Sequence, residues 1–208
     1  IIPLSSGGED YLVSVYSNGY GVVYRTYDYF FNLENLIYFK KQAVYDMHVL
    51  GNDIYLALSN GQMVIFNLSK KTSRVVNVFD SPVVKIEKSP SGIFFLTLKS
   101  GLLMKGSSLQ SSFERVKTPN GDFMFGSSKV RSLDFDQRGI IYLLNDKGAY
   151  ISNDGGDTFN LLKTIPLQEE KINIFEYNNG NIYVISGRRM YVSANNGKDW
   201  KITDLQNE

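Results

Sequence analysis

The amino-acid sequence predicts an all-β protein, a β-propeller of about five blades, each blade being a four-stranded antiparallel sheet. Three observations predict this fold. Short apolar runs rich in Tyr, Phe, Val and Ile recur along the 208 residues, and these residue types favour the half-buried surface of a pleated sheet. Glycine-containing turns recur at a nearly constant spacing. No segment shows the sustained 3.6-residue apolar period that is typical of an amphipathic helix.

The turns set the repeat length. Each contains a glycine after a small or polar residue, and successive glycines are 42, 40, 47 and 39 residues apart: Gly19, Gly61, Gly101, Gly148 and Gly187. Two short β-like runs on either side of such a turn predict a hairpin, because glycine tolerates the positive φ that tight hairpin turns need.

Each hairpin is flanked by one further run on either side. Val83–Ile86 precedes the third hairpin, and Phe113–Val116 follows it. Four short strands in about 40 to 45 residues is the pattern of a propeller blade. A single blade cannot bury both faces of its sheet, so we expect neighbouring blades to stack face to face around a continuous core.

We expect a single propeller domain over residues 1–208. Its blades are predicted at about 1–42, 43–80, 81–119, 129–166 and 168–206, with an inserted loop at 119–129. The apolar start, residues 1–4, supplies the first strand of the first blade or is the remnant of a preceding blade in a larger propeller.

Composition excludes several classes of site. There is no Cys, which excludes disulfides, zinc–thiolate sites and cysteine nucleophiles. The net charge is +1 and the basic residues are scattered among acidic ones, which disfavours nucleic acids and anionic membranes as partners. No apolar run approaches the ~20 residues that span a bilayer, so we expect no membrane insertion by this segment.

One eight-residue phrase occurs twice, as SNDGGDTF at 152–159 and SANNGKDW at 193–200. Both copies read Ser-x-Asp/Asn-x-Gly-x-x-aromatic. The Asp or Asn side chain is suited to accept backbone N–H bonds within a turn, and the glycine permits a left-handed backbone. We expect the same corner to be built twice, with the final aromatic ring tucked into the core between blades.

The phrase resembles the Asp-box, or bacterial neuraminidase repeat. The first copy matches at Ser152, Asp154, Gly156, Thr158 and Phe159, and the second at Ser193, Gly197 and Trp200, with Asn195 replacing the usual Asp. The third unit has a degenerate trace, 106–108 leading to Phe113, and the first two units have no copy with the expected residues.

The resemblance implies a propeller similar to those of sialidases, sortilin-like receptors, xyloglucan-active glycosidases and photosystem II assembly factors. In that family the box is an architectural corner away from the active-site face, and many members are exported. We therefore expect export to a periplasmic, extracellular or lumenal compartment. The other interpretation, a metal or ligand site at Asp154 and Asp157, is not favoured, because motifs that build a fold seldom carry its function.

No catalytic constellation is evident. A sialidase-like site would need arginines at equivalent blade positions, and the seven arginines do not occupy such positions. Asp134 and Asp136 lie two apart, on one predicted strand face, and could serve as a glycosidase pair, but we favour a channel lining. His48 is the only histidine, and neither a nucleophile elbow nor a metal-ligand spacing accompanies it. We expect no catalytic residue, metal or cofactor, and we expect that the protein is not an enzyme.

Alternation along the innermost strands predicts a mixed-charge channel lining. Its candidate residues are Asp46, His48, Lys85, Glu87, Asp134, Asp136 and Lys171. Such a ring would either bind a small polar ligand or a cation, or simply stay hydrated, and we favour the hydrated lining.

Two segments depart from the repeat and provide candidate partner-binding residues. The inserted loop carries Phe123, Met124 and Phe125, and the aromatic-rich segment 24–39 carries Tyr27, Tyr29, Phe30 and Phe31. Clustered exposed aromatics are typical of an interface. The equal alternative for the loop is that it caps the channel or core. For most aromatics of segment 24–39 we favour a place in the core or at ring closure, and the others could form a docking surface or stack on sugars.

The sequence thus favours a non-catalytic propeller that binds another protein, as an assembly factor or a receptor-like module. One alternative is a carbohydrate-binding or glycoside-hydrolase-type, sialidase-like module. Another is the ligand-sensing domain of a larger membrane receptor.

Overall fold

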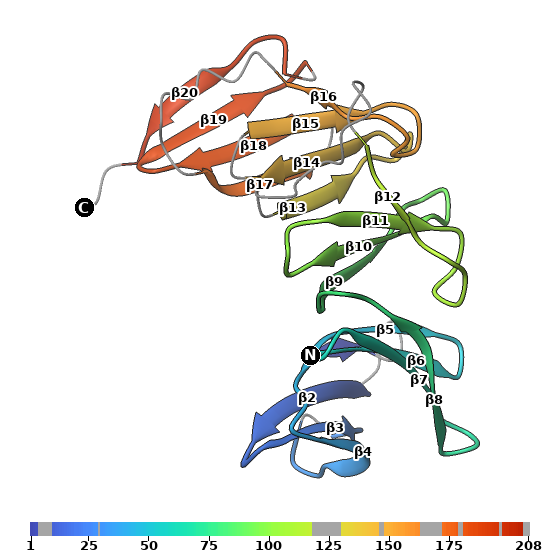
Figure 1. The fold of residues 1–208 in the computed structure, drawn as a ribbon. Coiled ribbons are helices and arrows are strands. Elements are labelled where there is room, and N and C mark those ends of the chain that lie inside the picture. The colour runs from blue at the N-terminus through green and yellow to red at the C-terminus, as the bar shows by residue number, and fades with distance from the viewer. Residues whose placement is uncertain are drawn as a thin grey trace. The chain divides into compact units, whose positions relative to one another are not determined.

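A computed structural model describes residues 1–3, 10–28, 30–117, 130–145, 148–162, 172–178, 181–195 and 197–205. In this part of the chain the strands form five four-stranded sheets, and within each sheet the strands pair antiparallel in the order of the sequence. Figure 1 shows the sheets following one another along the chain. The Phe123-Met124-Phe125 segment, Tyr29 and Lys171 lie outside the described residues.

The strand bounds follow the repeat. The first sheet contains β1 (Ile2–Pro3), β2 (Tyr11–Ser17), β3 (Tyr20–Thr26) and β4 (Glu34–Lys40). The second contains β5 (Val44–Leu50), β6 (Asp53–Leu58), β7 (Gln62–Asn67) and β8 (Thr72–Val78). The third contains β9 (Val83–Lys88), β10 (Phe94–Leu98), β11 (Leu103–Gly106) and β12 (Glu114–Arg115).

The last two sheets repeat the pattern. The fourth contains β13 (Val130–Phe135), β14 (Ile141–Asn145), β15 (Gly148–Ser152) and β16 (Asn160–Leu161). The fifth contains β17 (Ile172–Asn178), β18 (Asn181–Ser186), β19 (Arg189–Ser193) and β20 (Lys201–Asp204). Within the described residues, no helix is long and apolar enough to cross a membrane.

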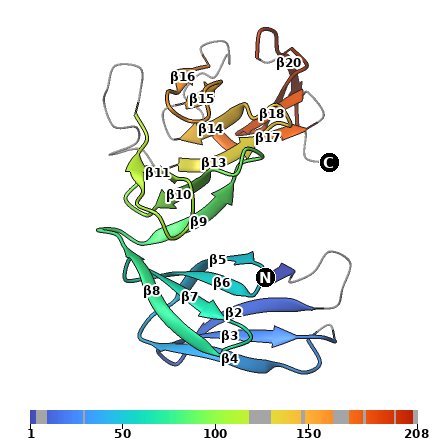
Figure 2. The ribbon, with the colours of Figure 1, turned by 90° about the vertical axis from the view of Figure 1, so that its right-hand side faces the viewer.

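The β2–β3 hairpin illustrates how the turn residues work. Asn18 has φ +52° and Gly19 has φ +79°. Two successive positive φ angles define a turn whose twist matches the strands it joins, and Asn-Gly is its preferred sequence. The register runs without a break from Ser17↔Tyr20 to Tyr11↔Thr26, and Figure 2 shows β2, β3 and β4 side by side.

The chain divides into two compact units, each with its own core. The first comprises Ile1–Ile86, Leu96–Lys99 and Leu109–Ser112, and the second Glu87–Phe95, Ser100–Ser108 and Phe113–Glu208. The first unit has a cluster that includes Leu12, Val23, Ile54, Leu56 and Phe66. The second has one cluster around Phe95, Leu103, Leu143 and Phe159, and another around Tyr142, Val184 and Tyr191.

In the second, third and fourth sheets the second strand is the most deeply buried one. All five residues of β10 (FFLTL) and of β14 (IYLLN) are buried. Side chains alternate between the two faces of a strand, so complete burial means that both faces of these sheets are covered. The last strands are different, since most of β8 is exposed. Exposed surface is therefore found mainly on the outer strands and on the corners that lead into them.

Candidate binding surface

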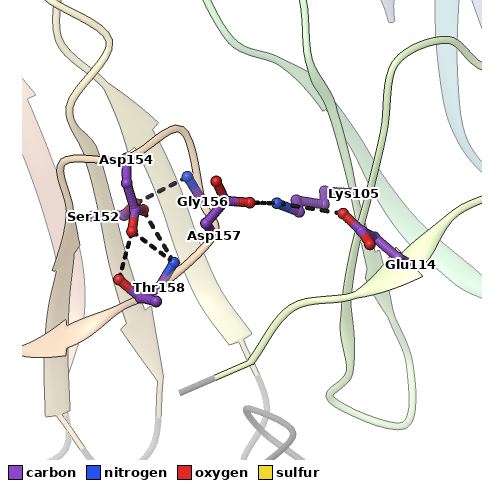
Figure 3. A network of polar contacts seen from close by, with 7 residues as sticks. All are labelled: Lys105, Glu114, Ser152, Asp154, Gly156, Asp157 and Thr158. Atoms are coloured by element: carbon purple, nitrogen blue, oxygen red, sulfur yellow. Dashed lines mark hydrogen bonds and ion pairs between the residues drawn. The ribbon is translucent and has the colours of Figure 1, made fainter. Parts of the chain in front are cut away.

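The corner at 152–159 connects β15 to β16 and is built on a buried hydroxyl. Ser152 is fully buried, and its Oγ accepts the N–H of Gly156 at 2.9 Å and donates to Asp154 Oδ1 at 2.7 Å. The Asp154 carboxylate accepts the Thr158 N–H at 3.0 Å and the Thr158 hydroxyl at 2.5 Å (Figure 3). The serine and the aspartate therefore satisfy backbone donors that no strand partner satisfies.

Two opposing effects set the pKa of the Asp154 carboxyl. Partial burial raises this pKa. The hydrogen bonds from the Thr158 hydroxyl and N–H and from Ser152 lower it by more than burial raises it. The result is a pKa of about 2, below the ordinary value of 3.8. Hydrogen bonds to the charged form stabilise that form, so Asp154 stays ionised over a wide pH range.

Glycine at the fifth position of this corner is required by its neighbours as well as by its backbone. Gly156 has φ +86°, and a Cβ there would lie 2.7 Å from Phe95 Cε1 and Cζ. Phe95 is fully buried and packs with Phe159, which is 1% exposed. The corner therefore lies directly on the core of the second unit.

Asp157 makes an ion pair with a lysine of the third sheet. Its carboxylate contacts Lys105 Nζ, and Lys105 also lies 3.4 Å from Glu114 Oε1 (Figure 3). Burial lowers the pKa of Lys105, but its hydrogen bonds and charge interactions with Asp157 and Glu114 outweigh burial and raise it overall. Within the described residues, no group of three His, Cys, Asp or Glu side chains is placed to hold a metal ion.

The corner at 193–200 uses the same contacts with Asn in place of Asp. Ser193 is fully buried, its Oγ accepts the N–H of Gly197 at 2.8 Å, and Asn195 Oδ1 accepts the N–H of Asp199 at 2.9 Å. Asn195 Oδ1 also accepts the Ser193 hydroxyl at 3.0 Å. An amide oxygen thus performs the acceptor role of a carboxylate. Trp200 packs against the cluster around Tyr142.

The first sheet contains a third copy of this hydrogen-bond pattern, in residues 26–33, where the sequence suggested none. Thr26 is fully buried, and its Oγ1 accepts the N–H of Phe30 at 3.0 Å and donates to Asp28 Oδ1 at 3.0 Å. Asp28 Oδ1 accepts the N–H of Asn32 at 2.9 Å. Thr26, Asp28, Phe30 and Asn32 correspond to Ser152, Asp154, Gly156 and Thr158.

Strand register confirms this equivalence. In each case eight residues separate the last paired positions, which are Arg25↔Glu34, Ile151↔Asn160 and Val192↔Lys201. The third sheet has the same spacing, at Lys105↔Glu114, but Gly106 at its first position provides no hydroxyl. A sequence pattern that requires glycine at the fifth position misses the first copy, because Phe30 occupies that position with φ +74°.

The corner at 26–33 exposes apolar side chains. Phe31 is 87% exposed, Tyr27 and Leu33 are each 50% exposed, and Phe30 is 42% exposed. These four residues are called the aromatic corner below. Large apolar side chains that are clustered and exposed are typical of interaction sites.

A polar network holds the aromatic corner in place. Arg25 donates to both carboxylate oxygens of Asp10, at 3.0 and 2.8 Å, and its guanidinium carbon lies 4.4 Å from the centroid of the Tyr27 ring. The Tyr27 hydroxyl donates to Glu34 Oε2 at 3.0 Å, and Lys71 Nζ lies 2.5 Å from Glu34 Oε1. These contacts restrict the rotamers of Tyr27, so less conformational entropy remains to be lost on binding.

Of the seven predicted partner-binding residues, the structure brings Tyr27, Phe30 and Phe31 together in the aromatic corner. Phe30 packs on Tyr11, with ring centroids 5.7 Å apart. Tyr29, Phe123, Met124 and Phe125 lie outside the described residues.

Several of the predicted channel-lining carboxylates are engaged by backbone donors. Asp46 on β5 accepts the N–H groups of Met47 and Ile86, at 2.9 and 2.7 Å. Burial raises the pKa of Asp46, and these hydrogen bonds only partly offset the increase. Asp134 on β13 accepts the N–H of Phe135 at 2.8 Å. His48 lies on β5, Lys85 and Glu87 lie on β9, and Lys171 lies outside the described residues.

Asp136 directly follows β13 and is 2% exposed. Its N–H donates to the carbonyl oxygen of Ile140 at 3.0 Å, which continues the hairpin beyond the pair Phe135↔Ile141. Its carboxylate accepts the N–H groups of Arg138 and Ile140 and the Arg138 Nε–H. These contacts hold the carboxylate in the turn that joins β13 to β14, a role that the sequence did not indicate. The channel lining as a set stays a prediction.

Comparisons with known proteins identify the fold of this chain but no family to which it belongs. No family model matches the chain, and no curated protein matches it. Among solved structures, YCF48 bound to a D1 peptide has a TM-score of 0.66 at 16% identity over 90% of this chain. The fold is a β-propeller. YCF48 from Cyanidioschyzon merolae has a TM-score of 0.64 at 13% identity over 92% of this chain.

An ancestral GH74 enzyme shares the propeller fold as well, with a TM-score of 0.62 at 15% identity over 97% of this chain. This chain spans 65% of the length of the first YCF48 chain, 71% of the second and 32% of the GH74 enzyme. These identities are low, so the likeness is one of fold, and it confirms the predicted propeller with four-stranded antiparallel blades.

Proposed function

We propose that this propeller is a non-catalytic protein-binding module and that the aromatic corner is part of its docking surface. The observation that carries the proposal is Phe30. Three corners share one hydrogen-bond pattern, and two of them place glycine at the position of positive φ, whereas the third places an aromatic residue there.

A phenylalanine at φ +74° is costly. The left-handed region costs non-glycine residues about 1–2 kcal/mol, and backbone strain of this kind is concentrated at functional sites. Its ring contact with Tyr11 offsets only part of this cost. The strained residue lies in a turn that also presents Phe31 to solvent. A binding role accounts for both features, because aromatic anchors dominate the energetics of many protein interfaces.

The comparisons support a binding role through the fold. A propeller of similar fold, YCF48, has been solved with a D1 peptide bound. Within this proposal, the corners at 152–159 and 193–200 are Asp-box corners with an architectural role, since their polar groups are used inside the turn. The proposal has three finer parts. The protein acts as an assembly factor or a receptor-like module, residues 1–208 form one propeller domain, and the protein is exported.

Site-specific photocrosslinking tests the proposal. A benzophenone amino acid at position 31 should capture a defined protein in an extract of the source organism. The same amino acid at position 202 is the matched control, because Ile202 is an exposed apolar residue, 49% exposed, on the last strand of another sheet. Tyr27→Ala should reduce capture at position 31, because Tyr27 belongs to the same surface.

Equal capture at positions 31 and 202 would contradict the aromatic corner as a docking surface. A carbohydrate-binding module is the second candidate, because exposed rings such as Tyr27 and Phe31 can also stack on sugars. Binding on a glycan array that Phe31→Ala abolishes, without protein capture at position 31, would favour that candidate.

A further inference from the structure

Two adjoining hollows lie between the outer strands of the first two sheets. Their volumes are about 520 and 390 Å³, and they share Tyr38 on β4 and Ser73 on β8 as lining residues. We propose that they form one groove that binds an extended, acidic peptide segment of a partner protein. This inference rests on the proposed protein-binding function and names a second surface with its own ligand chemistry.

The groove has an apolar floor and partly exposed walls. Leu58, Val64 and Phe66 line it and are no more than 5% exposed. Tyr38 is 66% exposed and Val75 is 47% exposed. Small apolar side chains of a ligand would therefore pack on the floor, and Tyr38 and Val75 would become less exposed to solvent. Each Å² of apolar area buried in this way favours binding by about 25 cal/mol.

All charged residues that line the groove are basic. Lys40, Lys71 and Arg74 line the hollows, and none of the described lining residues is acidic. Lys71 is paired with Glu34, but Arg74 donates to the neutral amide oxygen of Gln110 at 2.5 Å, which leaves its charge uncompensated by that contact. Charge complementarity therefore favours a ligand with carboxylates and disfavours a basic one.

The backbone of the groove favours an extended ligand. β4 pairs with β3 and β8 pairs with β7, and both are the last strands of their sheets. The far edge of a last strand provides main-chain groups that an added strand can use. An extended peptide also alternates its side chains between two faces, which suits an apolar floor and a basic rim.

Fluorescence anisotropy with a short fluorescein-labelled peptide in which Val and Asp alternate tests the inference. We expect saturable binding, and we expect Arg74→Glu and Lys40→Glu each to weaken it by about tenfold or more, which corresponds to about 1.4 kcal/mol. Both side chains are exposed, so these variants should keep the fold, which circular dichroism checks. Tyr38→Ala should also weaken binding without changing any charge.

Lys201→Glu is the matched control, because Lys201 is an exposed lysine on β20. An equal loss of affinity in Lys201→Glu and Arg74→Glu would reduce the effect to general charge attraction and overturn the groove. Equal binding of a Val–Lys peptide would overturn the acidic preference. Equal binding of a peptide with alternate backbone nitrogens methylated would overturn the extended main-chain pairing.

The two proposals fail separately. Phe31→Ala should leave the affinity for the Val–Asp peptide unchanged, because Phe31 does not line the groove. If the peptide does not bind while crosslinking at position 31 persists, only the groove is rejected. If the peptide binds as expected while position 31 captures nothing, only the aromatic corner is rejected.

Discussion

The corners at 26–33 and 152–159 are the same turn with opposite choices at the fifth position. A buried hydroxyl at the first position and a carboxylate at the third organise both turns. Gly156 lies against Phe95, where a Cβ has no room, whereas the Phe30 side chain reaches Tyr11 and solvent. The hydroxyl and the carboxylate therefore define the corner, and the space beside the fifth position determines which residue fits there.

The largest effect is expected at Gly156. Gly156→Ala adds a Cβ 2.7 Å from the buried Phe95 ring and imposes a positive φ on alanine. Overpacking costs about 1–3 kcal/mol, and left-handed strain adds about 1 kcal/mol. We expect the free energy of unfolding, measured by urea denaturation, to fall by about 2–4 kcal/mol.

Gly155→Ala is the control for this prediction. Gly155 has φ +71°, but a Cβ there would meet only Ile93 Cδ1, at an ordinary 3.6 Å. This variant should lose only the strain contribution, about 1 kcal/mol. Equal losses at 155 and 156 would show that backbone conformation, rather than the Phe95 contact, requires glycine in this corner.

Removal of the first-position hydroxyl should have the next largest effect, and it should be similar in the two corners. Ser152→Ala leaves the Gly156 N–H without its acceptor, and Thr26→Ala does the same to the Phe30 N–H. An unsatisfied buried donor costs about 1–3 kcal/mol. Thermal and urea denaturation measure both losses, and Thr26→Ser, which keeps the hydroxyl, is the control.

A loss of stability confined to Ser152→Ala would contradict the equivalence of the two corners. It would mean that the first corner does not depend on its Thr26 contacts, despite its similar geometry.

Phe30→Gly should change stability less than either hydroxyl deletion. Relief of left-handed strain gains about 1–2 kcal/mol, and loss of the Tyr11 ring contact costs about 0.5–1.5 kcal/mol. The lost ring contact offsets part of the strain that is relieved, so we expect a net change within about 1 kcal/mol. A partner that is captured at position 31 should nevertheless be captured less by Phe30→Gly, and undiminished capture would remove Phe30 from the docking surface.

The smallest effect is the pH dependence of the Asp154 contribution. The folded-state pKa of Asp154 is about 2, below the ordinary 3.8. A lowered pKa means that the stabilisation is fully present above pH 3.8 and is lost as the pH falls through about 2. Because the residue is exposed, solvent screening limits its value to about 1 kcal/mol or less.

Asp154→Asn isolates this contribution. The difference in unfolding free energy between the unsubstituted protein and Asp154→Asn should shrink as the pH falls from about 5 to about 2. Asn195 shows that an amide can occupy the equivalent position. A difference that does not change with pH would mean that the Asp154 charge contributes nothing to the corner.

The fold class was predictable from local signals. Spaced glycine turns and flanking β-formers predicted four-stranded antiparallel blades, and the structure together with its propeller neighbours confirms that class. Local signals suffice here because each blade is built from hairpins between strands that are consecutive in sequence. The partner-binding role of Tyr27, Phe30 and Phe31 stays a prediction, although their common placement in one turn adds to its support.

Other features were not predictable in the same way. The corner at 26–33 was missed because its fifth residue departs from the expected glycine. The hydrogen bonds that hold the Asp136 carboxylate in the turn after β13 were also not predicted. Strand alternation places a side chain on one face of a sheet, but it does not say which turn N–H groups that side chain reaches.

The repeat, the hairpins and the polar residues that build the corners at 152–159 and 193–200 could be predicted from the sequence, because they depend on residues close together in the chain. Three features became evident only from the folded chain: the contact that requires glycine at 156, the space that Phe30 occupies, and the hollow that both β4 and β8 line. Those features depend on which side chains of different strands meet, and no local pattern records that packing.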